Sequence, residues 1–374
     1  MATSTRFPEI RDNLNLSNGV FGTYLTLGGI GSLIAFMFVG NIVHKIGIKP
    51  VILVASTGLF ATMAAVPHIK SPLIWLAANI LIALFWVSFH ISNNSQAIHR
   101  QEEIGELILP KLHGLWSLGA LLTAVIAIVI TPYVSLAWHI DVLELAMWLA
   151  TLYGISKSTP YFIDKSDDEN DIPRISFASL IISIKSQPVI AITMVLAMQM
   201  EFAIQDWAAI FSRDSIGMSA SASIYGYTVF IGAMIIFRLN VQQLHRAFTE
   251  AQLLKFLPLL GGIGFIAFVP LGTIVAETNV KFGFALALLG FALGGFGSSI
   301  LSPTYFGIAF RNSSLPSSVV VAQLGLISAV LTFFIKITIS WVAQATSVTI
   351  ALMIPAIMLL VTSKFSYLGR ATKD

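Results

Sequence analysis

The stretch GVFGTYLTLGGIGSLIAFMFVGNI, from Gly19 to Ile42, carries no charged residue, and the basic connection VHKIGIK (residues 43–49) follows it. A helix needs about 20 mainly apolar residues to cross a bilayer, so this stretch predicts a membrane span that ends in a short polar loop. Comparable apolar runs follow along the chain. We predict ten further spans, at Pro50–Pro67, Pro72–Asn93, Gly114–Leu136, Trp138–Ile155, Pro188–Phe211, Ala222–Leu239, Leu254–Ala276, Phe282–Thr304, Ser318–Ala343 and Thr346–Thr362.

The composition agrees with a membrane protein. Of the 374 residues, 56% are hydrophobic and 10% are charged, whereas a soluble domain carries about 25% charged residues. The net charge of +3 and the lack of a dense basic patch argue against nucleic-acid binding. The chain has no cysteine, which excludes disulfides and thiol chemistry. Because lipid offers no partners for unpaired backbone groups, we predict an all-α membrane protein with about eleven transmembrane helices.

The distribution of basic residues predicts the orientation. Fifteen Lys and Arg residues fall on the side of the 43–49 connection, five fall on the other side, and Lys336 lies inside a span. Cytoplasmic loops carry the excess of positive charge. We therefore predict a multi-pass protein of the bacterial inner membrane with a cytoplasmic C-terminus.

One polar stretch divides the chain into two hydrophobic blocks. Residues 156–186 include five acidic side chains and read as a cytoplasmic linker. We predict an N-terminal bundle over residues 1–155 and a C-terminal bundle over residues 187–374. Five predicted spans precede the linker and six follow it. Since transporters are often built from matched halves, the front half is expected to lack its first helix.

Several motifs resemble the Major Facilitator Superfamily. Its loop motif between helices 2 and 3 is matched by Gly40, Lys45, Gly47 and Lys49, with His44 where the family has an Asp. Residues 6–17 look like the helix 1–2 connection of a bacterial inner-membrane subgroup distantly similar to the fucose:proton symporter. Further similarities are Asn94 at the predicted end of helix 4, His113–Gly119 opening helix 5, Glu201–Trp207 in helix 7 and Arg238 ending helix 8.

The resemblance implies two pseudo-symmetric bundles of twelve helices in all, arranged around an alternating-access cavity. On that alignment helix 1 is missing from this chain. We expect that the initiator methionine has been assigned too far downstream, and we favour this over a protein that naturally has eleven helices.

Ionisable groups within spans are costly and mark function by default. Glu201 is our first candidate for proton coupling, and a structural hydrogen bond between helices is the equal alternative. Asp206 is a second candidate, placed near the outer rim with Trp207 as an interface anchor. Lys336 is the expected charge partner of Glu201 or Asp206, unless it reaches outward to the membrane surface.

The predicted solute cavity draws on helices that line it in the family. His90 and Asn94 are four residues apart and share a helical face with a polar character. His90 is also a third candidate for proton coupling, and the alternative for this face is a polar helix end in cytoplasmic water. The remaining cavity candidates are Asn93, His113, Trp116, Gln205, Tyr225, Ser298 and Ser302, although the serines also suit bonds to their own helix.

The loop motif, with Gly40, His44, Lys45, Gly47 and Lys49, is the expected cytoplasmic gate. Because His44 replaces an acid, that gate is expected to be weaker or pH-dependent.

The predicted function is secondary active transport of a small polar solute, with proton-coupled symport as the mode and a monomer as the unit. No cofactor and no metal are expected, since the P-loop, HExxH and G-x-S-x-G signatures are absent from the sequence. Two alternatives stay open, namely an efflux antiporter for drugs or metabolites and a non-transporting receptor or scaffold on the same fold. An intramembrane enzyme is disfavoured, because no nucleophile–base or metal constellation is visible.

Overall fold

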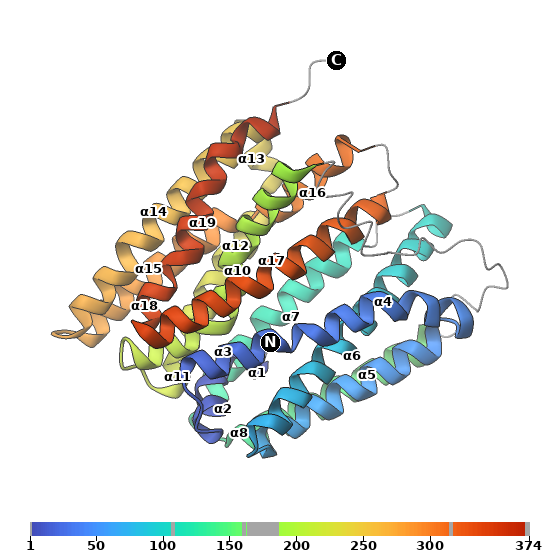
Figure 1. Cartoon of the computed structure of the whole chain (residues 1–374), viewed down its shortest axis with the longest axis horizontal. Coiled ribbons are helices and arrows are strands. Elements are labelled where there is room, and N and C mark those ends of the chain that lie inside the picture. The colour runs from blue at the N-terminus through green and yellow to red at the C-terminus, as the bar shows by residue number, and fades with distance from the viewer. Residues whose placement is uncertain (1, 106–108, 159–161, 163–186, 314–316, 371–374) are drawn as a thin grey trace.

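The computed structural model describes residues 2–105, 109–158, 162, 187–313 and 317–370, which form helices and turns with no strand among them (Figure 1). In chain order the helices are α1 (Ala2–Thr5), α2 (Phe7–Asn13), α3 (Asn18–Leu27), α4 (Gly29–Ile46), α5 (Ile48–Ala65), η1 (Val66–His68), α6 (Pro72–Ile104), α7 (Leu109–Ile130), α8 (Leu136–Ser158), α10 (Pro188–Asp214), α11 (Ala220–Ser223), α12 (Tyr225–Leu239), α13 (Val241–Ala247), α14 (Glu250–Ala276), α15 (Val280–Ser298), α16 (Leu301–Arg311), α17 (Ser317–Ala345), α18 (Val348–Ala351), α19 (Met353–Thr362) and η3 (Ser363–Gly369).

The all-α membrane architecture is confirmed. Within the described residues, nine helical stretches are long and apolar enough to cross a bilayer. The two other predicted spans correspond to α7, whose apolar part is Leu115–Ile130, and to α8, which carries Asp141 and Glu144. Every predicted span therefore falls on a helix or on two consecutive helices, with shifted boundaries.

Local chemistry explains where the helices begin and end. Gly47 ends α4 with a φ of 80°, a conformation that glycine adopts without strain. Thr249 and Gln252 form a capping box at the start of α14, which satisfies two free N–H groups there. Pro72 and Pro188 lie in the first turns of α6 and α10, where a missing N–H costs nothing.

The prediction that helix 4 ends near Asn94 is wrong. α6 continues to Ile104 and stops at Gly105, which has a φ of 69°. Polar side chains after Asn93 resembled a helix end, but the left-handed residue that ends α6 is Gly105, a residue without the steric cost of a Cβ atom. Asn93 and Asn94 therefore lie well inside the helix.

The C-terminal helices include a very close pair. A Cβ atom added to Gly297 of α15 would lie 2.5 Å from the Cα atom of Gly261 of α14. Gly272 and Gly283 meet in the same way further along the two helices. Small residues let helix backbones approach within a membrane and gain contact through van der Waals packing, so α14 and α15 form one tight unit.

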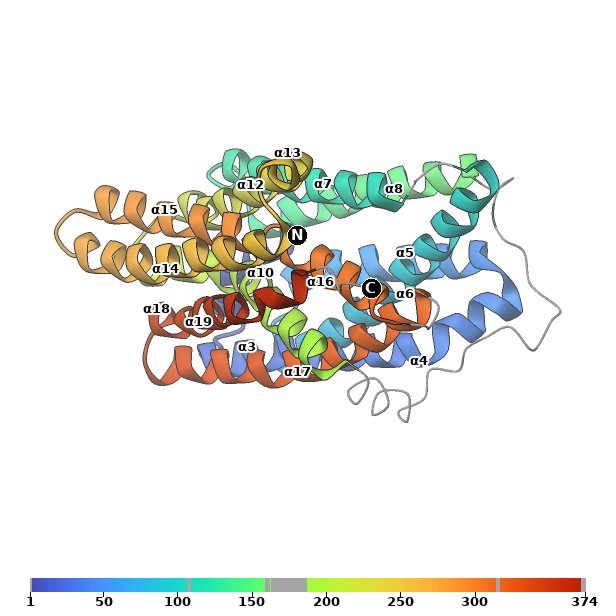
Figure 2. The same cartoon turned by 90° about the horizontal axis from the view of Figure 1, so that it is seen from above.

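Figures 1 and 2 show α4, α5, α6 and α8 on one side of the molecule and α14, α15, α18 and α19 on the other, with α7, α10 and α17 between them. The two groups match the two bundles expected of the fold. The boundaries at residues 155 and 187 stay predictions, because most of the 156–186 linker lies outside the described residues. We call the end that holds α2, η1 and α11 the outer end, following the predicted orientation, and the opposite end the inner end.

Helices of the N-terminal part of the chain pack closely against helices of the C-terminal part at the outer end. α3 packs along α17, where the backbone N–H of Gly19 donates to Oε1 of Gln344 at 3.3 Å and Gly22 faces Ser340 without room for a side chain. The Ser221 hydroxyl donates to the carbonyl of Ile128 at 2.5 Å and joins α11 to α7. α4, which continues α3 toward the inner end, packs far less against α17. The described helices are therefore closed outside and more widely separated inside.

We predict that Gly297→Ala lowers the thermal midpoint of the purified protein in detergent. The added methyl would force α15 away from α14, and overpacking of this kind costs about 1–3 kcal/mol. Gly154→Ala on α8 is the matched control, since a Cβ there meets nothing within 4 Å among the described residues. Equal midpoints for the two variants would contradict close packing of this pair.

Candidate functional site

Helix α10 carries both carboxylates that were singled out as proton-coupling candidates. Glu201 and Asp206 lie on this helix, five positions apart, and α10 contacts α12, α16, α17 and α19. Each carboxylate is matched by a cation from a different neighbouring helix. The site is therefore a pair of ion pairs arranged along one central helix.

Glu201 pairs with Arg238 of α12. The Arg238 Nη2 atom lies 3.1 Å from Oε2 of Glu201, and about a quarter of each side chain is exposed. Arg238 Nε also donates to the carbonyl of Ser299 at 2.8 Å. That carbonyl follows the end of α15, where the chain breaks before α16 begins at Leu301. Arg238 thus links a carboxylate that can accept a proton to a helix break.

Asp206 pairs with Lys336 of α17. The Lys336 Nζ atom lies 2.7 Å from Oδ2 of Asp206, whose side chain is 10% exposed. The ammonium also lies 5.7 Å from the ring centroid of Phe202, within range of a cation–π contact. Of the two partners expected for Lys336, the structure therefore selects Asp206. Asp206 therefore depends on Lys336, because removing the cation leaves an uncompensated buried charge.

The placement of Trp207 corrects the sequence-based interpretation. Trp207 was expected to anchor the protein at the membrane surface, yet it is only 3% exposed and its ring faces Gly22 of α3. An indole beside an acidic residue is typical of a membrane interface, but here the ring is buried and lies against Gly22 of α3. Asp206 accordingly lies inside the protein and not on its rim.

A second group of predicted residues gathers on α6 and α7. Nδ2 of Asn94 lies 3.1 Å from Nδ1 of His90, which confirms that the two share a face. The ring of Trp86 lies 6.3 Å from that of His90 and 6.5 Å from that of Trp116 on α7. Both tryptophans stay about 40% exposed. Together these side chains form an exposed surface of aromatic rings with an amide at one edge.

The other cavity candidates differ in their exposure to solvent. Gln205, Asn93 and Ser302 are half-buried and Tyr225 is exposed. Ser298 is buried and donates to the carbonyl of Gly294 in its own helix, which is the structural alternative raised above. The side chain of His113 lies outside the described residues.

The loop motif forms the turn between α4 and α5. Gly40 and His44 lie on α4, Gly47 forms the turn, and Lys45 and Lys49 are exposed. Nε2 of His44 is buried and has no hydrogen-bond partner among the described residues. The geometry fits a loop at the inner end, and its role as a gate remains a prediction.

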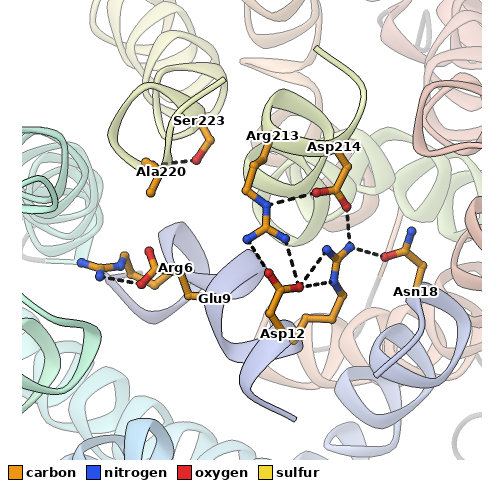
Figure 3. Close-up of polar contacts among 9 residues, drawn as sticks. Arg6, Glu9, Asp12, Asn18, Arg213, Asp214, Ala220 and Ser223 are labelled. Atoms are coloured by element: carbon orange, nitrogen blue, oxygen red, sulfur yellow. Dashed lines mark hydrogen bonds and ion pairs between the residues drawn. The ribbon is translucent and has the colours of Figure 1, made fainter. Parts of the chain in front are cut away.

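The charged residues of α2 and of the turn between α1 and α2 were expected only as part of a helix 1–2 connection, but the structure gives them specific partners. Arg6 is 2% exposed, and its guanidinium lies 3.1 Å from the Thr131 hydroxyl and 3.0 Å from Nδ1 of His139. A four-residue charge cluster also joins α2 to the end of α10 (Figure 3). The signal in the sequence was an Arg-Asp dipeptide that occurs both in α2 and at the end of α10.

Among the described residues, no group of three His, Asp or Glu side chains could hold a metal ion. The apolar helices and the ion pairs among them are those of a multi-pass membrane protein.

Comparison with known proteins gives the family. The family model described as Major Facilitator Superfamily matches residues 1–319. The chain belongs to the Major Facilitator Superfamily, and it is a transporter and not an enzyme. An uncharacterised MFS-type transporter of Yersinia pestis is 25% identical over 358 residues, covering 94% of this chain and 87% of the relative.

Solved structures of this family share the fold. A D-xylose–proton symporter matches with a TM-score of 0.71 at 14% identity, covering 98% of this chain and 92% of that one. The nucleoside transporter NupG matches with a TM-score of 0.70 at 13% identity, covering 99% and 94%. At such identities these matches establish the fold alone.

We predict that Lys336→Met destabilises the protein more than the double variant Lys336→Met/Asp206→Asn does. The single change leaves a largely buried carboxylate without its cation, at a cost of about 1–3 kcal/mol for this partly exposed pair. The double change removes both charges. Thermal unfolding in detergent measures the difference. Equal midpoints for the single and double variants would contradict the cost of an unpaired carboxylate at Asp206.

Proposed function

We propose that this transporter moves a small, neutral polar solute across the bacterial inner membrane by alternating access, in symport with protons. The single observation that carries the proposal is the Glu201–Arg238–Ser299 connection. It joins a protonatable side chain to a break in a membrane-spanning helix. The solved neighbours whose names describe symport of D-xylose with protons and transport of nucleosides give independent support.

The proton step follows from the geometry of this connection. A proton on Glu201 neutralises the carboxylate and removes its attraction for the Arg238 guanidinium. Arg238 then keeps its hydrogen bond to the Ser299 carbonyl, so the segment between α15 and α16 is free to move relative to α10. Loss of the proton restores the pair. Only a group with two charge states can bias two conformations in this way.

The solute site is proposed between the two bundles. Trp86 and Trp116 offer aromatic faces, while His90 and Asn94 offer hydrogen-bonding groups at the edge of the same surface. From the other bundle, Gln205 of α10 adds an amide, whereas Tyr225 lies at the outer end beside α11. Aromatic faces beside a few hydrogen-bonding groups suit a ring compound that carries hydroxyls. The charges of Glu201 and Asp206 are already paired, which favours a neutral solute.

The remaining expectations complete the proposal. The protein works as a monomer with a cytoplasmic C-terminus, and Lys45 and Lys49 lie at the cytoplasmic gate. The positive charge of the predicted inner loops supports this orientation.

Transport assays in proteoliposomes test the function. With an inward proton gradient, a labelled neutral solute is expected to accumulate, and a protonophore is expected to abolish that accumulation. D-xylose and a nucleoside are the first probes, because the solved neighbours move them. Accumulation that needs no proton gradient would contradict symport.

We predict that Glu201→Gln abolishes proton-driven accumulation of the transported solute but leaves counterflow exchange intact. The amide keeps the hydrogen-bonding shape of the side chain and cannot change charge, so only the coupled step is lost. Glu277→Gln, on an exposed acid at the outer end, is the matched control and is expected to accumulate solute normally. Accumulation by Glu201→Gln at the unmodified rate would exclude Glu201 as the coupling group.

A further inference from the structure

Four charged residues at the outer end form a closed ring of alternating sign. Nη1 of Arg11 lies 2.6 Å from Oδ2 of Asp214, and Arg213 contacts both oxygens of Asp12 at 2.9 and 3.1 Å. Within each dipeptide, Arg11 lies 3.1 Å from Asp12 and Arg213 lies 3.1 Å from Asp214. The Arg11 guanidinium also donates to Oδ1 of Asn18 at 2.6 Å. Figure 3 shows that these contacts bridge α2 and the end of α10.

The ring is built from the same dipeptide used twice. Arg11-Asp12 comes from the N-terminal half and Arg213-Asp214 from the C-terminal half. The first Arg pairs with the second Asp, and the second Arg pairs with the first Asp. This reciprocal pattern is that of a self-complementary contact about a two-fold axis, here between two halves of one chain.

The arginines of the ring are well shielded from water. The side chains of Arg11 and Arg213 are 11% and 22% exposed, whereas that of Asp12 is 55% exposed. Burial alone would lower the pKa of Arg11, but the hydrogen bonds and charges of Asp214 and Asp12 outweigh it and raise the pKa. Arg11 therefore stays charged at every physiological pH. A single exposed ion pair contributes little, but a bidentate network with shielded members contributes more.

The ring lies where the two halves of the molecule meet. At the same end, α3 is pressed against α17 at Gly22 and Ser340. On α4, which continues α3 toward the inner end, and on the inner half of α17 the situation differs. A Cβ atom added to Gly40 or Gly325 would meet nothing within 4 Å in the described part of the chain.

We propose that Arg11, Asp12, Arg213 and Asp214 form a clasp that holds the outer side closed and must open for the transporter to face outward. The inference rests on the proposed alternating-access function, and it adds the group of residues that sets the balance between its two states. Opening breaks the two cross-pairs and leaves the two contacts within the dipeptides in place.

The clasp is tested by reversing the order of its residues. The exchange Arg11→Asp/Asp12→Arg changes neither composition nor net charge, yet it sets Asp against Asp214 and Arg against Arg213. The exchange Arg213→Asp/Asp214→Arg does the same from the other side. Carrying both exchanges together restores an Arg opposite an Asp at both cross-pairs.

Distances between spin labels report the conformation without any need for a solute. The chain has no cysteine, so labels enter only where cysteines are introduced. Exposed positions Lys70 and Thr278 serve as the outer pair, and exposed positions Ser158 and Gln243 as the inner pair. Measurements are made on the full chain in lipid nanodiscs by double electron–electron resonance.

Each single exchange is expected to raise the outer-open population about fivefold for each of the two lost cross-pairs, and to shorten the inner distance. The double exchange is expected to return both distances to those of the unmodified protein. The control Arg100→Glu/Glu103→Arg reverses the exposed Arg100–Glu103 pair of α6 and is expected to change neither distance. If a single exchange does not fold, Asp214→Asn gives a milder loss of one cross-pair with the same expected direction.

Unchanged distances in the single exchanges would overturn the clasp, and so would failure of the double exchange to restore closure. These readings do not depend on solute identity or on protons. A failure of the proposed symport would instead appear as a lack of accumulation in protein whose label distances respond as expected.

Discussion

Lipid provides no water to solvate a charge, so each carboxylate on α10 needs a cation supplied by the protein itself. Glu201 takes Arg238 from α12 and Asp206 takes Lys336 from α17. These two pairs fix how α12 and α17 lie against α10, and the rest of the C-terminal bundle packs around that arrangement. A helix that could have been purely apolar is therefore held in register by electrostatics, and the same groups are available for proton chemistry.

The positions of the membrane-spanning helices could be predicted from the sequence because apolar length is a local property. The pairing across helices could not. Lys336 was a candidate partner for either carboxylate, and only packing of α17 against α10 decides between them. Arg238 was recognised as a motif residue but not as the partner of Glu201, because the break after α15 that brings the Ser299 carbonyl beside it has no clear sequence signal. Trp207 was predicted at the membrane surface. Its burial could not be predicted from the sequence either, because it depends on packing of the ring against Gly22 of α3.

The two ends of the molecule are held by different chemistry. Toward the inner end, His44 stands where the family carries an acid, and its Nε2 atom has no partner among the described residues. At the outer end, two arginines and two aspartates form a complete ring and glycine brings α3 close to α17. The described structure, closed outside, agrees with this imbalance of contacts. The described state therefore faces inward, because its contacts between the two halves are concentrated at the outer end.

The charge ring has one more property, which follows from its composition. Each half of the protein contributes one Arg and one Asp, so each side of the ring is neutral by itself. When the halves separate, no net charge moves across the membrane field, whereas moving a single charge through 100 mV involves about 2.3 kcal/mol. The membrane potential therefore does no net work on this contact when it opens, and any voltage dependence of the transport cycle must arise from other charges, such as those paired along α10.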